Sequence, residues 1–356
     1  MKRLYFVLLI FLAGTTTAFS QVSNCTQVVR LARTIYEQGR LHELPTLMDG
    51  CLNLTVAADK RFTTPERKEA LRYLTLAYIY LEEPEKADET MLKLLDTDHF
   101  YQVNQSVDPA EFIALFNKFR HEPIFRIGFK IGLNATQPIV KNYYNVGSAG
   151  AGMGKYGMKP SFQALIVFEK DITKKIVLAP EIGYVVRGFN YTNPQLAVAD
   201  EDPNKSISSQ EFVVSQNYLD LNVLGQYKIK NTLELQTYVG GGPGISYLLG
   251  SSNQASTLLG NGFTVTGGSV DDTKSYNKLL YSFTAVVGGK IKFGEIYLTA
   301  DVRYQYGLTT SVNKSSRSNP EVAYDYQGQY NDYKLSNFMI NIGMVYPYFK
   351  PKKLIK

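Results

Sequence analysis

Residues 296–306 read Ile296-Tyr297-Leu298-Thr299-Ala300-Asp301-Val302-Arg303-Tyr304-Gln305-Tyr306. Apolar side chains recur at every second position from Ile296 onward, and Thr299, Asp301, Arg303 and Gln305 lie between them. Successive side chains of a β-strand point to opposite faces, so this alternation predicts a strand with one apolar and one charged face. The segment is also longer than the ~5–6 residues usual for strands of soluble proteins.

The same alternation recurs in seven other segments, whose apolar faces begin at Phe125, Phe162, Ile176, Leu219, Leu233, Tyr281 and Phe338. The connections alternate as well. Short turns are expected at 171–175, 230–232 and 293–295, and long loops rich in Gly, Ser, Asn and Asp at 140–158, 192–210, 251–273 and 311–332. Short turns on one rim and long loops on the other are typical of an eight-stranded antiparallel transmembrane β-barrel. A soluble β-sandwich is the alternative, but the long segments and their Tyr and Phe ends favour the barrel.

Composition excludes several other classes of protein. The chain of 356 residues is 44% hydrophobic, 20% charged and 13% aromatic, which excludes disorder. A mean hydropathy of −0.17 and the lack of a long internal apolar run argue against a helical membrane protein. Basic residues are spread along the barrel segments instead of clustering, so we expect no nucleic-acid partner.

The first twenty residues predict a secretory signal peptide, residues 1–20. Lys2 and Arg3 precede an apolar core, and Ala18-Phe19-Ser20 offers a cleavage site; a membrane anchor is the alternative, but the core is short for one. Export places Cys25 and Cys51 in a compartment where disulfides persist. Both cysteines are expected near the free ends of two antiparallel helices joined at Gly39. We expect them to pair, two buried free thiols being the alternative.

Residues 21–122 predict a helical domain. Apolar residues recur there at three- and four-residue spacing, and Thr64-Pro65-Glu66 is a helix start signal. Residues 22–122 carry 12 Lys and Arg against 16 Asp and Glu, whereas 123–356 carry 24 against 16, so we place the domain boundary at Pro123. The spacing of small and apolar residues over 70–94 resembles that of a tetratricopeptide unit, and residues 36–41 resemble a degenerate one. The residues in this pattern are Ala70, Leu74, Ala77, Tyr78, Leu81, Pro84, Ala87, Met91 and Leu94.

Such repeats normally need about three units to close a core. Two units and a helix are therefore expected to bind a protein partner through residues 22–122, or to dock on the barrel. A self-contained helical cap without a partner is the alternative.

The barrel interior is expected to hold a network of charges: Arg126, Lys130, Glu169, Glu181, Arg187, Asp220, Lys228, Glu234, Lys290, Lys292, Asp301 and Arg303. An eight-stranded barrel is just wide enough for its own side chains to fill it. Buried charges must be paired, so we expect a salt-bridged plug. A narrow polar pore or proton path is the alternative.

Enzymatic chemistry has little support in the sequence. All three histidines, His42, His99 and His121, precede the barrel, so none can activate a serine inside it. Acidic loop segments at 200–202 and 271–272 are read as solvated charge instead of calcium sites. Residues 150–155 imitate a phosphate loop without its strand and helix. We expect neither an enzyme nor a cofactor or metal site.

Several short motifs, in order, resemble the PorT-like outer-membrane barrel family over residues 123–349. They are Gly128-Phe129-Lys130-Ile131-Gly132-Leu133-Asn134, Leu178-Ala179-Pro180-Glu181-Ile182-Gly183-Tyr184, Tyr218-Leu219-Asp220-Leu221, Gly241-Gly242-Pro243-Gly244 and Arg303-Tyr304-Gln305-Tyr306-Gly307-Leu308. The family often has a proline where this chain has Asn222. Some members are associated with type IX secretion and gliding. The last strand resembles the signal read by the barrel assembly machinery, through Asn341, Gly343, Tyr346 and Tyr348, although a basic tail follows it here.

The sequence thus predicts an α+β chain of two domains: tetratricopeptide-like helical hairpins at 21–122, and the barrel with a short basic C-terminal tail at 123–356. We expect the Gram-negative outer membrane as location, with the helical domain and C-terminus periplasmic and lipid around the barrel. The expected function is a non-enzymatic anchor for a protein-interaction domain, and its most specific form is an accessory of an envelope or type IX secretion complex. A narrow small-solute or ion conduit is the alternative, and an envelope hydrolase is a third hypothesis, resting on the long outer loops.

Overall fold

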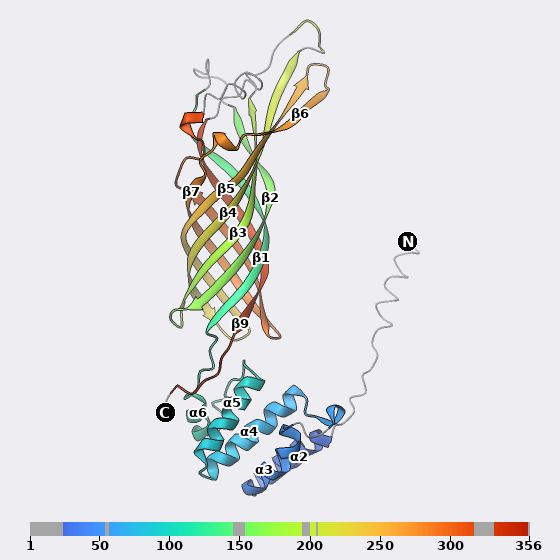
Figure 1. Cartoon of the computed structure of the whole chain (residues 1–356), viewed down its shortest axis with the longest axis vertical. Coiled ribbons are helices and arrows are strands. Elements are labelled where there is room, and N and C mark those ends of the chain that lie inside the picture. Colours follow the sequence, from blue (N-terminus) through green and yellow to red (C-terminus); the bar gives the residue numbers. More distant parts are fainter. Residues whose placement is uncertain are drawn as a thin grey trace, which may run out of the picture. The chain divides into compact units, whose positions relative to one another are not determined.

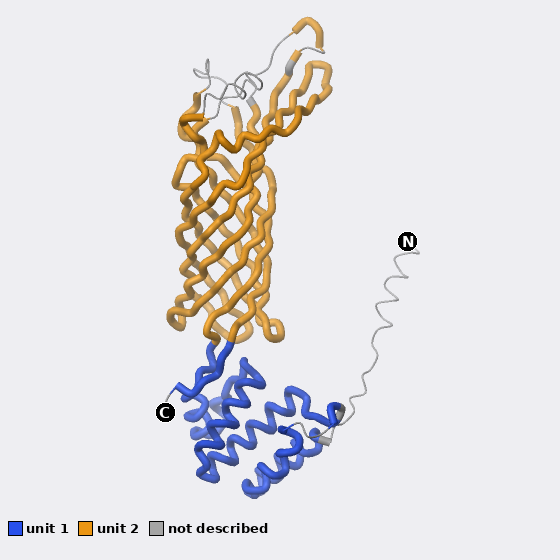
Figure 2. The backbone as a smooth tube through the Cα atoms, viewed as in Figure 1, with its two compact units in different colours: residues 1–122, 349–356 blue, residues 123–348 orange. Residues whose placement is uncertain are grey.

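The computed structural model describes residues 24–53, 57–144, 154–193, 200–203, 206–316 and 331–354. The chain divides into two compact units, residues 1–122 with 349–356 and residues 123–348 (Figure 2). The expected signal peptide, residues 1–20, lies outside the described residues. The C-terminal tail, which we expected to belong to the barrel, groups with the helical unit.

The barrel unit is a closed antiparallel ring of eight strands (Figure 1). They are β1 (Phe125–Asn142), β2 (Lys155–Asp171), β3 (Ile176–Asn193), β4 (Ile207–Asn231), β5 (Leu235–Leu259), β7 (Leu279–Phe293), β8 (Ile296–Gly307) and β9 (Asp332–Tyr348). The ring closes because β1 pairs with both β2 and β9, while β4 pairs with both β3 and β5. The connections β2–β3, β4–β5 and β7–β8 are short, as the sequence predicts.

A ninth strand, β6 (Thr264–Asp271), lies outside the ring and pairs with β5. The sequence predicts a loop over 251–273, and this prediction is wrong for most of the segment. β5 continues to Leu259 and turns back through Asn261-Gly262, where Gly262 adopts a φ of 86°. Asn-Gly dipeptides favour the tight turns that join two antiparallel strands. The resulting hairpin projects from the long-loop end of the barrel (Figure 1).

The helical unit contains five described α-helices, namely α2 (Asn24–Glu37), α3 (Leu44–Leu52), α4 (Thr64–Tyr80), α5 (Pro84–Thr97) and α6 (Ala110–Phe116). One core cluster packs α2 and α3 on α4, and a second packs α4, α5 and α6 together. The predicted disulfide between Cys25 and Cys51 is confirmed. Among the described residues, no helix is long and apolar enough to cross a membrane.

Helix α4 begins at the predicted start signal, but its N-cap is Thr63 and not Thr64. Pro65 occupies the first turn, and the Thr63 backbone N–H donates to the Glu66 carboxylate over 2.8 Å. Partial burial would raise the pKa of Glu66. Hydrogen bonds donated by the Thr26 and Thr63 hydroxyls, at 2.5 and 2.9 Å, outweigh it, so the pKa of Glu66 lies below its usual value.

Candidate functional site

The outer face of the barrel is apolar along every strand of the ring. In β8 the exposed and buried residues alternate strictly, with Leu298 and Tyr304 outside and Asp301 and Arg303 inside. Across the ring, the exposed large apolar residues include Phe129, Ile131, Phe162, Ile166, Ile182, Leu221, Ile245, Phe283, Val287, Ile291, Ile340 and Ile342. A continuous apolar surface of this kind is suited to lipid and not to water.

Asp301 of β8 is the centre of the charge network inside the barrel. Its carboxylate accepts from Arg303 Nε at 2.6 Å and from Lys130 Nζ at 2.8 Å. Arg303 also binds both carboxylate oxygens of Glu181, one of them at 3.0 Å, and Lys130 lies 3.5 Å from the same carboxylate. None of the four side chains is more than 2% exposed, so each charge depends on the others for its compensation.

Three further groups of charges accompany this centre. Near the short-turn rim, Asp171 binds Arg126 at 2.7 Å and Lys228 at 2.8 Å. Lys290 pairs with Glu169. Toward the other end, Arg187 binds Asp220 at 2.6 Å. We call the eleven residues of these groups and the Asp301 centre the lumen network: Arg126, Lys130, Glu169, Asp171, Glu181, Arg187, Asp220, Lys228, Lys290, Asp301 and Arg303.

Ten of the twelve predicted lumen residues lie buried in this network, and two do not. Glu234 is exposed, because β5 begins only at Leu235 and the residue falls in the turn. Lys292, near the end of β7, is only half-buried. The acid that the sequence analysis missed is Asp171, which we placed in a turn. It is the last residue of β2 and shares the inward parity of Glu169, a signal that was present in the sequence.

An apolar cluster closes the interior beyond Arg187. It joins inward residues of the strands to two loop residues, and its members are Phe189, Val214, Tyr218, Leu248, Tyr276, Leu280, Val312, Tyr333 and Leu335. The Tyr218 ring is fully buried and lies under the Arg187 guanidinium, 4.4 Å from it. The interior therefore has a charged layer followed by an apolar layer.

The four residues of the expected assembly signal lie on both faces of β9. Asn341 and Gly343 point inward, and Tyr346 and Tyr348 are exposed on the outer face. Asn341 donates to Asp301 at 2.8 Å and accepts from Gln163 at 2.5 Å. Interior packing is thus a role for Asn341 besides the expected recognition.

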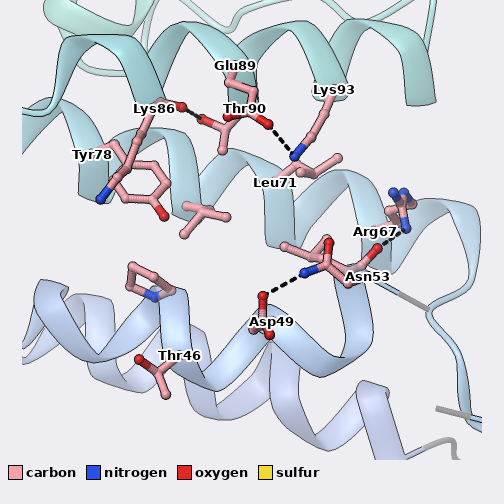
Figure 3. Close-up of a pocket in the computed structure, with 13 residues that line it drawn as sticks. Thr46, Asp49, Asn53, Arg67, Leu71, Tyr78, Lys86, Glu89, Thr90 and Lys93 are labelled. Carbon is pink, nitrogen blue, oxygen red and sulfur yellow. Dashed lines mark hydrogen bonds and ion pairs between the residues drawn. The ribbon is translucent and has the colours of Figure 1, made fainter. Parts of the chain in front are cut away.

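The helical unit holds a cleft of about 610 Å³ over α4, between α3 and α5 (Figure 3). Its lining is mostly polar and consists of Pro45, Thr46, Asp49, Leu52, Asn53, Arg67, Leu71, Leu74, Tyr78, Lys86, Glu89, Thr90 and Lys93. Local contacts hold several of these side chains in place. Asn53 donates to Asp49 at 2.6 Å, Arg67 donates to the Leu52 carbonyl at 3.2 Å, and Lys93 lies 2.8 Å from Glu89.

Tyr78 is the aromatic residue of the cleft. Partial burial raises the pKa of Tyr78, so its hydroxyl remains a neutral hydrogen-bond donor at physiological pH. The Lys86 ammonium lies 5.5 Å from its ring centroid. The cleft thus offers a half-buried ring and cations. In the described part of the chain, no group of three His, Cys, Asp or Glu side chains is arranged to hold a metal ion.

A closed ring of eight antiparallel strands, apolar outside and charged inside, defines an outer-membrane β-barrel. The family described as outer membrane protein beta-barrel domain matches residues 118–313, and the chain belongs to this family. The match covers the ring from β1 to β8.

Solved structures similar to the chain are barrels too. Neisserial surface protein A is 13% identical, with 63% of this chain and 97% of that one covered and a TM-score of 0.32. OprG from Pseudomonas aeruginosa is 12% identical, with 64% and 98% covered and a TM-score of 0.37. AlkL is 14% identical, with 66% and 92% covered and a TM-score of 0.31. Similarity at this level carries no information on role. No curated protein matches the chain.

Proposed function

We propose that the chain is a non-enzymatic outer-membrane barrel that anchors a helical protein-interaction unit. The observation that carries this proposal is the filled interior of the barrel. Six cations and five acids of the lumen network compensate one another, and the apolar cluster around Tyr218 follows them. A barrel occupied by its own side chains serves as a membrane anchor, and the surfaces left for recognition lie outside it.

The cleft of the helical unit is the proposed recognition site. Its volume of about 610 Å³ falls in the range of ligand sites, and its polar lining around Leu71 and Tyr78 suits a segment of a protein partner. The paired helices α2–α3 and α4–α5 support a tetratricopeptide-like reading of this unit. In the more specific form of the proposal, the barrel is PorT-like, the helical unit and C-terminus are periplasmic, and the partner belongs to an envelope or type IX secretion complex.

Site-specific photo-crosslinking in intact cells tests this proposal. A photoreactive residue at Thr46 or Glu89, on opposite sides of the cleft (Figure 3), is expected to give discrete crosslinked proteins. The same residue at Ala114, exposed on α6, is the matched control. Deletion of residues 22–121 should abolish the partner while the barrel still inserts. Equal yields at Ala114, or recovery of the same partner by the truncated barrel, would contradict the proposal.

A narrow conduit for ions or small solutes is the second candidate, and one observation favours it. Among the described residues, the buried amide of Gln226 and the Oδ1 atom of Asn222 have no hydrogen-bond partner in the protein. Buried polar atoms of this kind are normally satisfied by water. Planar bilayer recordings separate the candidates, because steady conductance that changes with substitution of Arg303 would favour the conduit over the anchor.

A further inference from the structure

The chain segments that flank the barrel strands form a two-stranded ribbon in the helical unit. Residues 118–122 precede β1, and residues 350–354 follow β9. The Arg120 N–H donates to the Lys352 carbonyl at 2.9 Å, and the Leu354 N–H donates to the Lys118 carbonyl at 2.8 Å. Phe119 and Lys353 face each other as an antiparallel bridge. Side chains therefore alternate between two faces of the ribbon.

One face of the ribbon packs on the helices. Phe119 is 2% exposed, and Lys353 forms an ion pair with Asp88 of α5. Phe349, of the same parity, stacks on His99 with ring centroids 5.3 Å apart. These contacts fix which face of the ribbon is covered.

The opposite face is basic, and all of its cations are exposed except Arg120, which is half-buried. It carries Lys118, Arg120, Lys350 and Lys352 against one acid, Glu122, and Leu354 at its end is 57% exposed. Within the described residues, none of the four cations forms an ion pair. The contrast with the rest of the helical unit is large, because residues 22–122 have an excess of acids. The basic face is therefore a local feature and not a consequence of overall composition.

The peptide chain limits how far this face can lie from the ends of the barrel strands. Tyr348 ends β9 and Phe125 begins β1, and the exposed ring of Tyr348 stacks on the half-buried ring of Phe125 with centroids 4.9 Å apart. Because each residue advances the chain by at most about 3.6 Å, Lys350 lies within roughly 7 Å of Tyr348 and Lys352 within roughly 14 Å. Aromatic rings at strand ends mark the interface of a membrane barrel, and Lys and Arg beside it attract anionic headgroups.

We propose that the basic face of the ribbon, Lys118, Arg120, Lys350 and Lys352, binds the phosphate headgroups of anionic phospholipids. The bound leaflet is the one next to the short-turn rim. Leu354 would enter the headgroup layer, as an apolar residue beside cations does at membrane surfaces. Docking of the ribbon would orient the helical unit, because lipid phosphates attract the basic ribbon and repel the acidic side chains in the rest of the unit.

The test uses the full chain carrying Leu354→Cys, labelled with an environment-sensitive fluorophore. Cys25 and Cys51 are disulfide-bonded and do not compete for the label. The protein is placed in nanodiscs of phosphatidylcholine alone, or of phosphatidylcholine with one quarter phosphatidylglycerol. We expect blue-shifted emission only in the anionic discs, reversed by 1 M salt, where the screening length falls to about 3 Å.

The variant Lys118→Gln, Arg120→Gln, Lys352→Gln is expected to lose the shift. Each charge contributes about fivefold to the ratio of lipid-bound to free ribbon, so removing three charges should lower this ratio about a hundredfold. The matched control Arg30→Gln, Arg40→Gln, Lys60→Gln removes the same charge from exposed positions elsewhere on the unit and should keep the shift. The heat-dependent gel mobility of each variant verifies that its barrel is folded.

Identical emission in both kinds of disc overturns the proposal, and so does a salt-independent shift. Loss of the shift in the control variant would also overturn it, because net charge and not the ribbon would then be responsible. The salt experiment needs no change beyond the labelled Leu354→Cys. No partner protein is present, so the outcome is independent of whether the cleft binds one.

Discussion

Replacing Asp301 by asparagine tests whether the charge network fills the barrel interior as a dry plug. The substitution keeps the size of the side chain and removes its charge. Lys130 and Arg303 lie 2.8 and 2.6 Å from the Asp301 carboxylate, and both would then depend on Glu181 alone. Two cations would share one carboxylate at sites that are at most 2% exposed.

The expected loss in the free energy of unfolding is about 3–5 kcal/mol, which is the usual cost of removing one partner of a buried ion pair. The assay is guanidinium unfolding in detergent, with the folded fraction read from the mobility of unheated samples on a gel. The double variant Asp301→Asn, Lys130→Met restores the balance of one cation to one acid and should recover part of the loss. Glu234→Gln, in the exposed β4–β5 turn, should stay within about 0.5 kcal/mol of the parent.

A loss below about 1 kcal/mol in Asp301→Asn would refute the reasoning, because only exposed ion pairs contribute so little. The interior would then be hydrated enough to screen its charges, as the conduit requires. The same outcome would remove the main support for the anchor.

Three further predictions concern the helical unit of the full chain. Cys25 and Cys51 are 26 residues apart, so by the chain-entropy relation replacing both with alanine should lower the free energy of unfolding by about 3.5 kcal/mol. Unfolding is followed by circular dichroism at 222 nm, and reductant should destabilise the parent chain but not the variant. The lowered pKa of Glu66 stabilises the folded state above the carboxyl's unfolded pKa, and this contribution is lost as the pH falls through the folded value. Glu66→Gln should therefore flatten the acid limb of a stability–pH curve, while an unchanged limb would contradict this. Phe349→Ala removes ring contacts with His99 and Phe100, whose centroids lie 5.3 and 5.1 Å away, and should destabilise the unit by about 2 kcal/mol. Amide hydrogen exchange in residues 99–101 should become faster. Exchange as slow as in the parent would count against this packing.

The ring of strands could be predicted from the sequence because its determinant is local. Alternation in each segment assigns every residue to lipid or interior without knowledge of its neighbours, as in β8. The buried status of most network residues follows from the same rule. The rule fails at strand ends, where a turn reorients the chain: Glu234 leaves the interior, whereas Asp171 stays within it. The β5–β6 hairpin was missed because its Gly, Ser and Asn content was read as loop.

The partners within the network could not be predicted, because they depend on contacts between distant strands. Lys130 and Asp301 are 171 residues apart, and only the register of the closed ring brings them together. The cleft depends on how α3, α4 and α5 pack, which periodicity does not specify. The ribbon pairs residues from both ends of the barrel, and the Lys-rich tail alone gives no sign of a strand partner.

The charge balance of the lumen network bears on where this protein can act selectively. Pores select ions with rings of like charge, so a conduit with a preference would need an excess of one sign along its path. Six cations and five acids leave a single excess charge here, and each acid lies within 4 Å of a cation. Selectivity then has to come from surfaces outside the interior. Variants of the cleft around Tyr78 should therefore change what the protein binds without changing barrel stability, whereas variants around Asp301 should do the reverse.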